Sequence, residues 1–198
     1  MVHKVICSNT APIWHLAKIK EIKTEWNKYT DFEVTTNLDI DSLKEVYKKI
    51  IIPEKVQEEI EMHRRCPQIA KDFITQDIVR KVSVGDQAKV EYLLNQYMGG
   101  KDSLRNRGEC ETFVLASEQG LSALLANDGA EDMFDRENRT IERHVEYISL
   151  IPFGKYCLQQ GLVKEEDFTN FLKILKALNY KPNKHENIFR EYGIELGS

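Results

Sequence analysis

The sequence lacks several features that would indicate a membrane, a secretory or a zinc-binding protein. No apolar run approaches the roughly 18 residues of a membrane span, so we expect no membrane insertion. The N-terminal residues are apolar for only a few positions, which is typical of a strand rather than a signal peptide and predicts a cytoplasmic protein. The four cysteines include no Cys-x-x-Cys pair, which favours reduced thiols without a metal. The net charge of −4 gives no overall field that attracts nucleic acid, so any phosphate-binding surface must be local.

The pattern of apolar residues predicts strands that alternate with helices. Short apolar runs at residues 2–7, 50–52, 121–126 and 145–148 and an alternating pattern at residues 78–84 are typical of strands, and helical spacing follows most of them. The last third of the chain has a helical pattern of aromatic and leucine residues. This order predicts an α/β fold with a central, mostly parallel sheet. We expect one domain over residues 1–198, with an insertion near residues 23–42.

Acidic and amide side chains occupy positions where an α/β sheet commonly binds ligands. Asn9 and Asp128 each follow a predicted strand, and ligands bind beyond the carboxyl ends of parallel strands. Two acidic pairs open or enter neighbouring helices, namely Glu58 with Glu59 and Glu109 with Glu111. Oxygen ligands without cysteine or histidine suit Mg²⁺ or Mn²⁺, and such a cation supports phosphodiester hydrolysis. The alternative is that these glutamates are solvated residues on helix surfaces.

Basic residues near these acids are candidates for binding substrate phosphates. Arg64 and Arg65 follow Glu59, and three further basic residues precede Glu109, namely Lys101, Arg105 and Arg107. An ordinary solvated loop is an equally good interpretation. The Gly99-Gly100-Lys101-Asp102 sequence lacks the other residues of a phosphate-binding P-loop. The five histidines have no zinc-hydrolase spacing, and His15 beside Trp14 is interpreted as packing.

Four segments resemble the motifs of PIN-like toxin nucleases. They are VICSNTAPI at residues 5–13, IPEKVQEEI at 52–60, GECETFVLA at 108–116 and LLAND at 124–128. Their order and spacing are similar to the family over most of the chain, except for the longer segment at residues 23–42. The resemblance implies a three-layer α/β/α fold and a ribonuclease that depends on Mg²⁺ or Mn²⁺. It also implies a toxin held inactive by an antitoxin protein, and a homodimer.

Carried over by position, the resemblance places catalytic metal ligands at Asn9, Glu59, Glu111 and Asp128. It places Thr10 and Glu109 close by, and Thr10 joins Arg65, Lys101, Arg105 and Arg107 as a candidate for substrate binding. The family has aspartate where this chain has Asn9. An amide oxygen can bind a cation but carries no charge, so metal affinity should fall.

Three functions therefore remain open from the sequence. The first is a metal-dependent ribonuclease acting on RNA. The second is a weakened or inactive PIN-like module that binds RNA or a protein partner, which Asn9 favours. The third is an unrelated α/β interaction domain whose acids are plain surface.

Overall fold

The computed structural model describes residues 4–97, 106–126, 133, 136–137, 145–180 and 185–196. The strands are β1 (Val5–Ser8), β2 (Lys49–Pro53), β3 (Val79–Val82), β4 (Ala123–Leu125) and β5 (Glu146–Ile148). The helices are α1 (Thr10–Thr24), the 3-10 helix η1 (Trp26–Lys28), α2 (Ser42–Val46), α3 (Glu54–Met62), α4 (Gln68–Phe73), α5 (Gln87–Tyr97), α6 (Arg107–Glu118), α8 (Leu150–Gln159), α9 (Glu165–Ala177) and α10 (Glu186–Glu191). None of the helices in these ranges is both long and apolar enough to cross a membrane.

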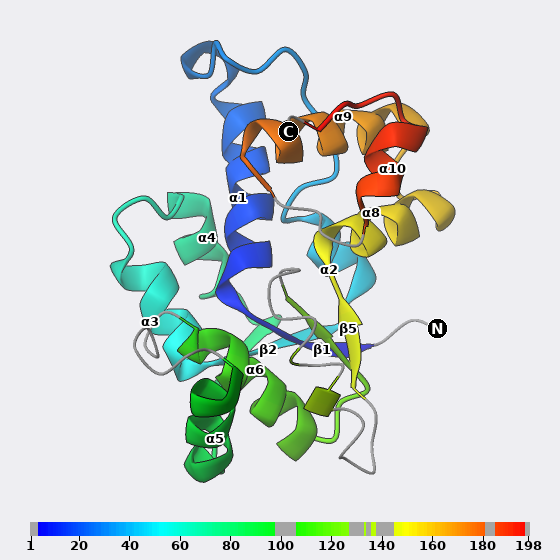
Figure 1. The fold of residues 1–198 in the computed structure, drawn as a ribbon. Helices are drawn as coiled ribbons and strands as arrows, with labels where there is room; N and C mark the ends of the chain where they lie inside the picture. The colour runs from blue at the N-terminus through cyan, green and yellow to red at the C-terminus, as the bar shows by residue number, and fades with distance from the viewer. Residues whose placement is uncertain are drawn as a thin grey trace.

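The strands form one parallel sheet in the order β3-β2-β1-β4-β5 (Figure 1). In β1, Ile6 pairs with Ile50 of β2 on one side, and Cys7 pairs with Leu124 of β4 on the other. The chain order reverses direction at β1, so β1 and β4 lie at the switch point where such sheets bind ligands. This topology confirms the predicted parallel sheet.

Successive residues of the central strands pack into two different hydrophobic clusters. Ile50 and Ile52 join the larger cluster, whereas Ile51 between them joins the smaller one. Both faces of the sheet are therefore covered, since side chains alternate across a strand. Figure 1 shows α1 and the C-terminal helices on one side of the sheet and α5 and α6 on the other. The arrangement is a three-layer α/β/α fold, as the motif resemblance implies.

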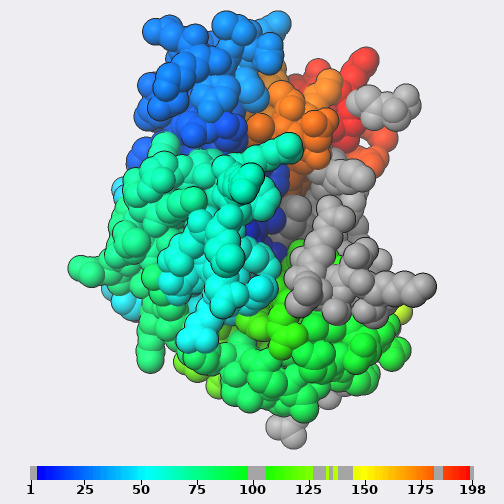
Figure 2. All heavy atoms as spheres, turned by 90° about the vertical axis from the view of Figure 1, so that its left-hand side faces the viewer, coloured from blue at the N-terminus to red at the C-terminus, as the bar shows by residue number. Residues whose placement is uncertain are grey.

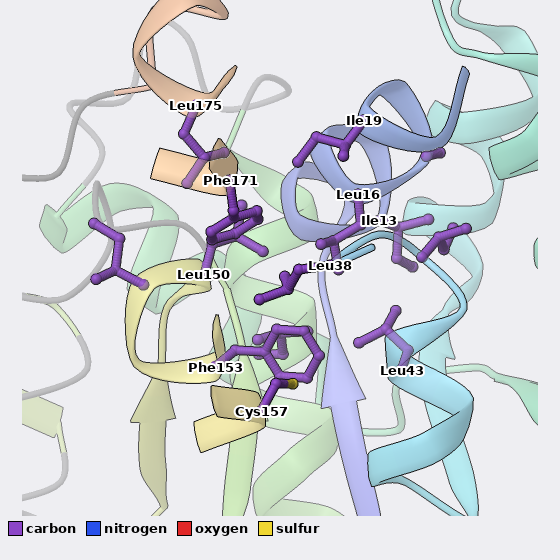
Figure 3. Close-up of a cluster of buried hydrophobic side chains, with 14 of the residues drawn as sticks. Ile13, Leu16, Ile19, Leu38, Leu43, Leu150, Phe153, Cys157, Phe171 and Leu175 are labelled. Atoms are coloured by element: carbon purple, nitrogen blue, oxygen red, sulfur yellow. The ribbon is translucent and has the colours of Figure 1, made fainter. Parts of the chain in front are cut away.

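The larger cluster brings the C-terminal third of the chain against the N-terminal half. Figure 3 shows Phe153 of α8 and Phe171 of α9 packed with Leu38 and with Leu16 of α1. A Cβ atom added at Gly154 would lie 3.0 Å from the rings of both Phe168 and Phe171. Only glycine allows α8 and α9 to approach this closely.

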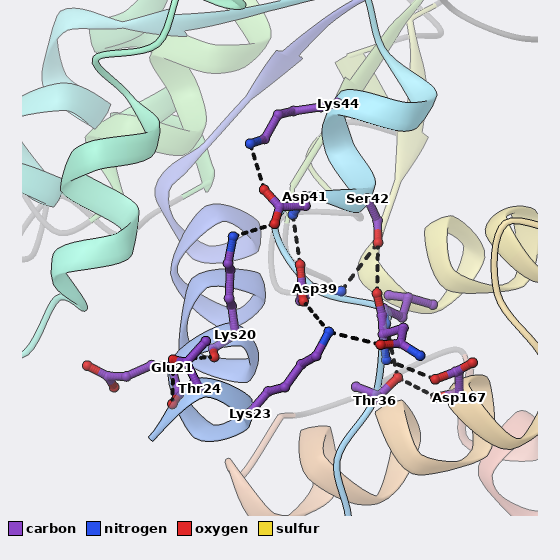
Figure 4. Close-up of polar contacts among 12 residues, drawn as sticks. Lys20, Glu21, Lys23, Thr24, Thr36, Asp39, Asp41, Ser42, Lys44 and Asp167 are labelled. Carbon is purple, nitrogen blue, oxygen red and sulfur yellow. Dashed lines mark hydrogen bonds and ion pairs between the residues drawn. The ribbon is translucent and has the colours of Figure 1, made fainter. Parts of the chain in front are cut away.

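The segment predicted as an insertion begins inside a helix, because α1 continues to Thr24. Beyond η1, polar contacts fix this segment to the helices around it (Figure 4). Asp41 accepts hydrogen bonds from Lys20 of α1 and pairs with Lys44 of α2. The Thr36 hydroxyl donates to the backbone carbonyl of Asp167 at 2.7 Å. Residues 36–44 are therefore an integral part of the packed structure.

Candidate metal and phosphate site

A pocket of about 870 Å³ opens between the N-terminal ends of α1 and α6 and the flank of α3. Its lining residues are Asn9, Thr10, Ala11, Trp14, His15, Lys55, Glu58, Glu59, Met62, His63, Arg65, Cys66, Gly108 and Glu109. Figure 2 shows this face, with dark-blue residues of the early chain lying deep behind the cyan and teal residues of α3 and α4. The pocket lies at the carboxyl edge of the sheet, where the sequence predicts the site.

Asn9 sits at the end of β1 and is the N-cap residue of α1. Its backbone N–H donates to Leu125 of β4 at 3.1 Å, which fixes the residue beside the neighbouring strand end. The side chain forms no capping hydrogen bond, although asparagine at this position commonly does. Its Oδ1 is buried and has no hydrogen-bond partner among the residues that the structure describes. A buried acceptor without a donor is unfavourable, so this oxygen is suited to a ligand that supplies positive charge.

Glu59 reaches the pocket from the flank of α3, next to the face that Val56 and Ile60 anchor in the core. The Thr10 hydroxyl donates a short hydrogen bond to Glu59 Oε2. This bond connects the first turn of α1 to α3 and holds the carboxylate beside Asn9. Burial raises the pKa of Glu59 above its ordinary value, the Thr10 bond opposes that rise, and the negative charge of Glu111 adds to it.

Glu109 enters the same pocket from the first turn of α6. Burial raises its pKa to about 7, and the neighbouring Glu59 carboxylate contributes to this rise. The approach depends on Gly108, where an added Cβ atom would lie 3.0 Å from Glu59 Oε1. Glu109 and Glu59 are therefore brought together, and only the charge of Lys55 and the Thr10 bond favour the Glu59 carboxylate. A cation would relieve the remaining repulsion between the two acids.

Glu111 lies on another side of α6 and does not line the pocket. It is buried, and its Oε1 accepts a hydrogen bond from Arg107 Nε at 2.9 Å. Arg107 also binds Glu91 Oε1 at 2.6 Å and Gln87 Oε1 at 2.7 Å, both in α5. Arg107 is thus held by two carboxylates, which leaves it less available to a substrate phosphate.

The remaining predicted residues fall into three groups. Arg65 lines the pocket, as predicted for substrate binding. Glu58 also lines it, but pairs with Lys55 at 3.1 Å. The predictions for Lys101, Arg105 and Asp128 lie outside the described residues.

The donors in the pocket fit a hard divalent cation. Asn9 offers an unpartnered amide oxygen, and Glu59 and Glu109 offer carboxylates of raised pKa. Mg²⁺ commonly binds one or two carboxylates and keeps several waters, so a complete protein cage is unnecessary. Within the ranges that the structure describes, no three His, Cys, Asp or Glu side chains form a metal-binding group by themselves.

One wall of the pocket was not predicted from the sequence. Trp14, Met62, His63 and Cys66 line it together with Arg65. The interpretation of His15 as packing agrees with its contacts, because Nδ1 lies 2.8 Å from the Ala11 carbonyl and the ring is edge-on to Trp14 and Tyr180. The helical spacing of Trp14 with core residues concealed its pocket-facing side, since a partly buried aromatic residue can serve both purposes.

Comparison with known families agrees with the fold and the position of the pocket. The family model DUF3368, described as a PIN domain, matches residues 31–137, which is more than half of the chain. The chain therefore belongs to this PIN-domain family, whose fold is that of a nuclease. The matched region includes Glu59, Glu109 and Glu111 but not Asn9. No curated protein and no solved structure matched the chain.

Proposed function

We propose that this protein is a metal-dependent endoribonuclease whose site is the pocket formed by Asn9, Glu59 and Glu109. The observation that carries the proposal is the meeting of an unpartnered buried amide oxygen with two carboxylates of raised pKa. It occurs at the carboxyl edge of a parallel sheet in a PIN-family chain. Charges gathered in this way favour a cation over an empty pocket.

Asn9, Glu59 and Glu109 would hold Mg²⁺ or Mn²⁺, and Glu111, on another side of α6, would act on Glu59 through its charge. We retain Asp128 as a further ligand, because the motif resemblance assigns it that role. The chemistry that such a cation supplies is polarisation of a phosphoryl oxygen and a lowered pKa of water. A nucleophilic side chain is not needed for this reaction.

The chain's own residues would position the reactants. The Thr10 hydroxyl holds the Glu59 carboxylate through its hydrogen bond. Arg107 holds Glu111 at the far side of α6 and partly neutralises it. Arg65, from the opposite wall, would bind a substrate phosphate. The buried carboxylates would thus hold the cation while Arg65 at the pocket wall binds the substrate phosphate.

The test is a titration of the full chain with Mn²⁺, followed by cleavage of a panel of single-stranded RNAs. We expect saturable binding, a rise in melting temperature and metal-dependent cleavage. Glu59→Gln should remove all three, whereas Glu61→Gln, on an exposed part of the same helix, should leave them intact. Unchanged Mn²⁺ affinity in Glu59→Gln would overturn the site.

The motif resemblance leads to finer proposals. We propose that the ribonuclease is the toxin of a toxin–antitoxin pair, that it acts in the cytoplasm and that it forms a homodimer. Expression of the chain alone should then arrest growth in a way that depends on Glu59. Absence of arrest with an active enzyme would separate the toxin proposal from the ribonuclease proposal.

A second candidate function is a PIN-like module that binds RNA or a protein partner without hydrolysis. Two observations favour it: Asn9 is neutral where the family has aspartate, and Glu111 is engaged by Arg107 at 2.9 Å. Under this proposal, RNA binding persists in the wild-type chain while cleavage stays absent even in saturating Mn²⁺. The same titration therefore distinguishes the two functions.

A further inference from the structure

The pocket has a second half with a chemistry different from that of the acidic half. Its wall is formed by Trp14 of α1, Met62 at the end of α3, and His63 and Arg65 in the connection to α4. None of these four residues is acidic. Aromatic surface combined with positive charge is the usual composition of a site for single-stranded nucleic acid.

Trp14 is held in a fixed orientation at this wall. Its indole Nε1 donates to the backbone carbonyl of Arg65 at 3.4 Å, which connects α1 with the residues that follow α3. Its ring is edge-on to His15, with centroids 4.9 Å apart, and His15 is in turn edge-on to Tyr180. The indole is only half-buried, so part of a rigid aromatic surface remains open to the pocket.

Met62 adds apolar surface to the same pocket. Its exposed fraction of 79% is the largest among the exposed large hydrophobic residues of the described chain. A long, flexible thioether at the mouth of a pocket can cover one face of a flat ligand. Trp14 and Met62 therefore offer apolar contacts from α1 and from the end of α3.

Arg65 supplies charge that is not neutralised by a neighbouring acid. It has no ion pair within the part of the chain that the structure describes, whereas Lys55 on the same pocket is paired with Glu58. Its backbone N–H donates to His63 Nδ1 at 3.2 Å, which orders this short connection. An anion entering the pocket is therefore attracted to the Arg65 wall and repelled by the Glu59 and Glu109 wall.

We propose that this second half binds one unpaired nucleobase stacked on Trp14 and covered by Met62, with the adjoining phosphate on Arg65. The proposal rests on the proposed function, because it places the next phosphodiester of the same strand at Asn9 and Glu59. A base inside a duplex has no free face for stacking, so the substrate is single-stranded RNA. This subsite would favour single-stranded over double-stranded RNA and would determine which phosphodiester bond lies at Asn9 and Glu59.

The experiment uses the intrinsic fluorescence of Trp14. The chain has two tryptophans, and Trp26 in η1 does not line the pocket. Trp26→Phe therefore leaves Trp14 as the only tryptophan reporter. The full chain is titrated with a short 2′-O-methyl oligoribonucleotide that cannot be cleaved, first in chelator and then in Mn²⁺. We expect saturable quenching with the single strand and little quenching with its duplex.

Substitutions at three residues make the result specific. Trp14→Phe keeps an aromatic ring but leaves only Trp26 to emit, so quenching should disappear while binding falls by less than about tenfold. Met62→Ala, at an exposed residue, should weaken binding by about tenfold, within the range measured for lost base contacts. Arg65→Ala should weaken binding and reduce its salt dependence, and Arg65→Lys should restore part of both.

The proposal is overturned if the duplex quenches Trp14 as strongly as the single strand, or if Met62→Ala and Arg65→Ala leave affinity unchanged. It is also overturned if only an apolar peptide, and no RNA, quenches Trp14, since the occupant is then a protein segment. Because the oligonucleotide is uncleavable, quenching without any cleavage of normal RNA would support the subsite and reject the ribonuclease. Cleavage of RNA without quenching of Trp14 would support the ribonuclease and reject the subsite.

Discussion

Two acidic regions of this molecule differ in how their charges are compensated. Around residues 36–44, which we call the paired network, Asp41 lies between Lys20 and Lys44, and Asp39 lies 3.5 Å from Lys23 (Figure 4). Burial alone would raise the pKa of Asp41, but its two lysine partners lower it. These contacts complete the packing of a connecting segment and need no ligand.

In the pocket, by contrast, neither Glu59 nor Glu109 forms an ion pair with another described residue. Burial raises the pKa of Glu109 to about 7 with Glu59 adding to the effect, and Asn9 Oδ1 has no donor. Carboxylates are frequent in both regions, so their number does not distinguish a structural network from a site. The direction of the pKa shifts does, because the two lysines outweigh burial at Asp41, whereas burial outweighs the nearby positive charge at Glu59.

The largest expected difference between the two regions is in cleavage rate, after one carboxylate is neutralised in each. Glu59→Gln should lower Mn²⁺-dependent cleavage by at least about 100-fold, since ligand and supporting contacts at metal sites commonly cost about 10–100-fold even when indirect. Asp41→Asn should leave cleavage unchanged and lower the free energy of unfolding by no more than about 1 kcal/mol, because its ion pairs are partly exposed. Cleavage kinetics and urea unfolding of both variants provide the measurement. If both variants lost the same amount of cleavage activity, the distinction between a site and a structural network would be wrong.

A weaker effect is expected when a charge is added. Asn9→Asp should tighten Mn²⁺ binding by about tenfold and raise cleavage, because a carboxylate adds attraction to a hard cation. Without metal, the variant should be less stable than the parent, since the new charge faces Glu59. Calorimetric titration and thermal unfolding in chelator measure the two effects.

The matched control is Asn37→Asp, which makes the same chemical change in the paired network. Lys23 already donates to Asn37 Oδ1 at 2.9 Å and would pair with the new carboxylate. Mn²⁺ affinity should stay at the parental value. If Asn9→Asp also leaves it there, Asn9 is not a ligand; if affinity rises without cleavage, the binding-module function is correct.

Two glycine-to-alanine substitutions test the pocket and the hydrophobic core separately, because each adds a methyl group at a close contact. Gly108→Ala would displace the Glu59 carboxylate, a flexible group at 3.0 Å, so Mn²⁺ affinity should fall several-fold with little loss of stability. Gly154→Ala would instead meet two aromatic rings and Leu38, and should cost about 1–3 kcal/mol. Chemical denaturation paired with Mn²⁺ titration separates the effects. Loss of stability at Gly108 with unchanged affinity would contradict the role assigned to it.

The sequence predicted the centre of the sheet well because β2 and β4 are nearly uniform apolar runs. Residues 50–52 are buried on both faces, and residues such as Ile51 and Ile52 contribute to opposite clusters. The end of β1 then places Asn9 at the sheet edge without further information. The prediction of one domain over the whole chain stays a prediction, as do the metal ligands. The insertion near residues 23–42 also stays a prediction, and contacts of that segment such as Thr36 with Asp167 could not be read from the sequence because they follow no periodic pattern.

The sequence could not decide which acid of α6 faces the pocket. Glu109 and Glu111 are two residues apart, so they point to different sides of a helix. The structure directs Glu109 to the pocket and Glu111 to Arg107. One signal was present, since Arg107 and Glu111 have the i,i+4 spacing of a helical ion pair. The rotation of α6 itself depends on the close approach at Gly108, which is a tertiary contact.

The smallest effect concerns the stability of the metal-free protein. Glu109→Gln removes the carboxylate whose pKa is raised to about 7, so at pH 8 it removes a charge that the folded state disfavours. We expect the free energy of unfolding in chelator to rise by on the order of 1 kcal/mol, about the equivalent of one pKa unit. In Mn²⁺ the order should reverse, because the parent gains binding energy that the variant lacks. Glu91→Gln is the control, since Glu91 is an exposed carboxylate that pairs with Arg107 at 2.6 Å, and its loss should not stabilise the protein. Urea unfolding of the three proteins with chelator and with Mn²⁺ measures the change, and a metal-free Glu109→Gln variant less stable than its parent would show that the pocket acids are not in conflict.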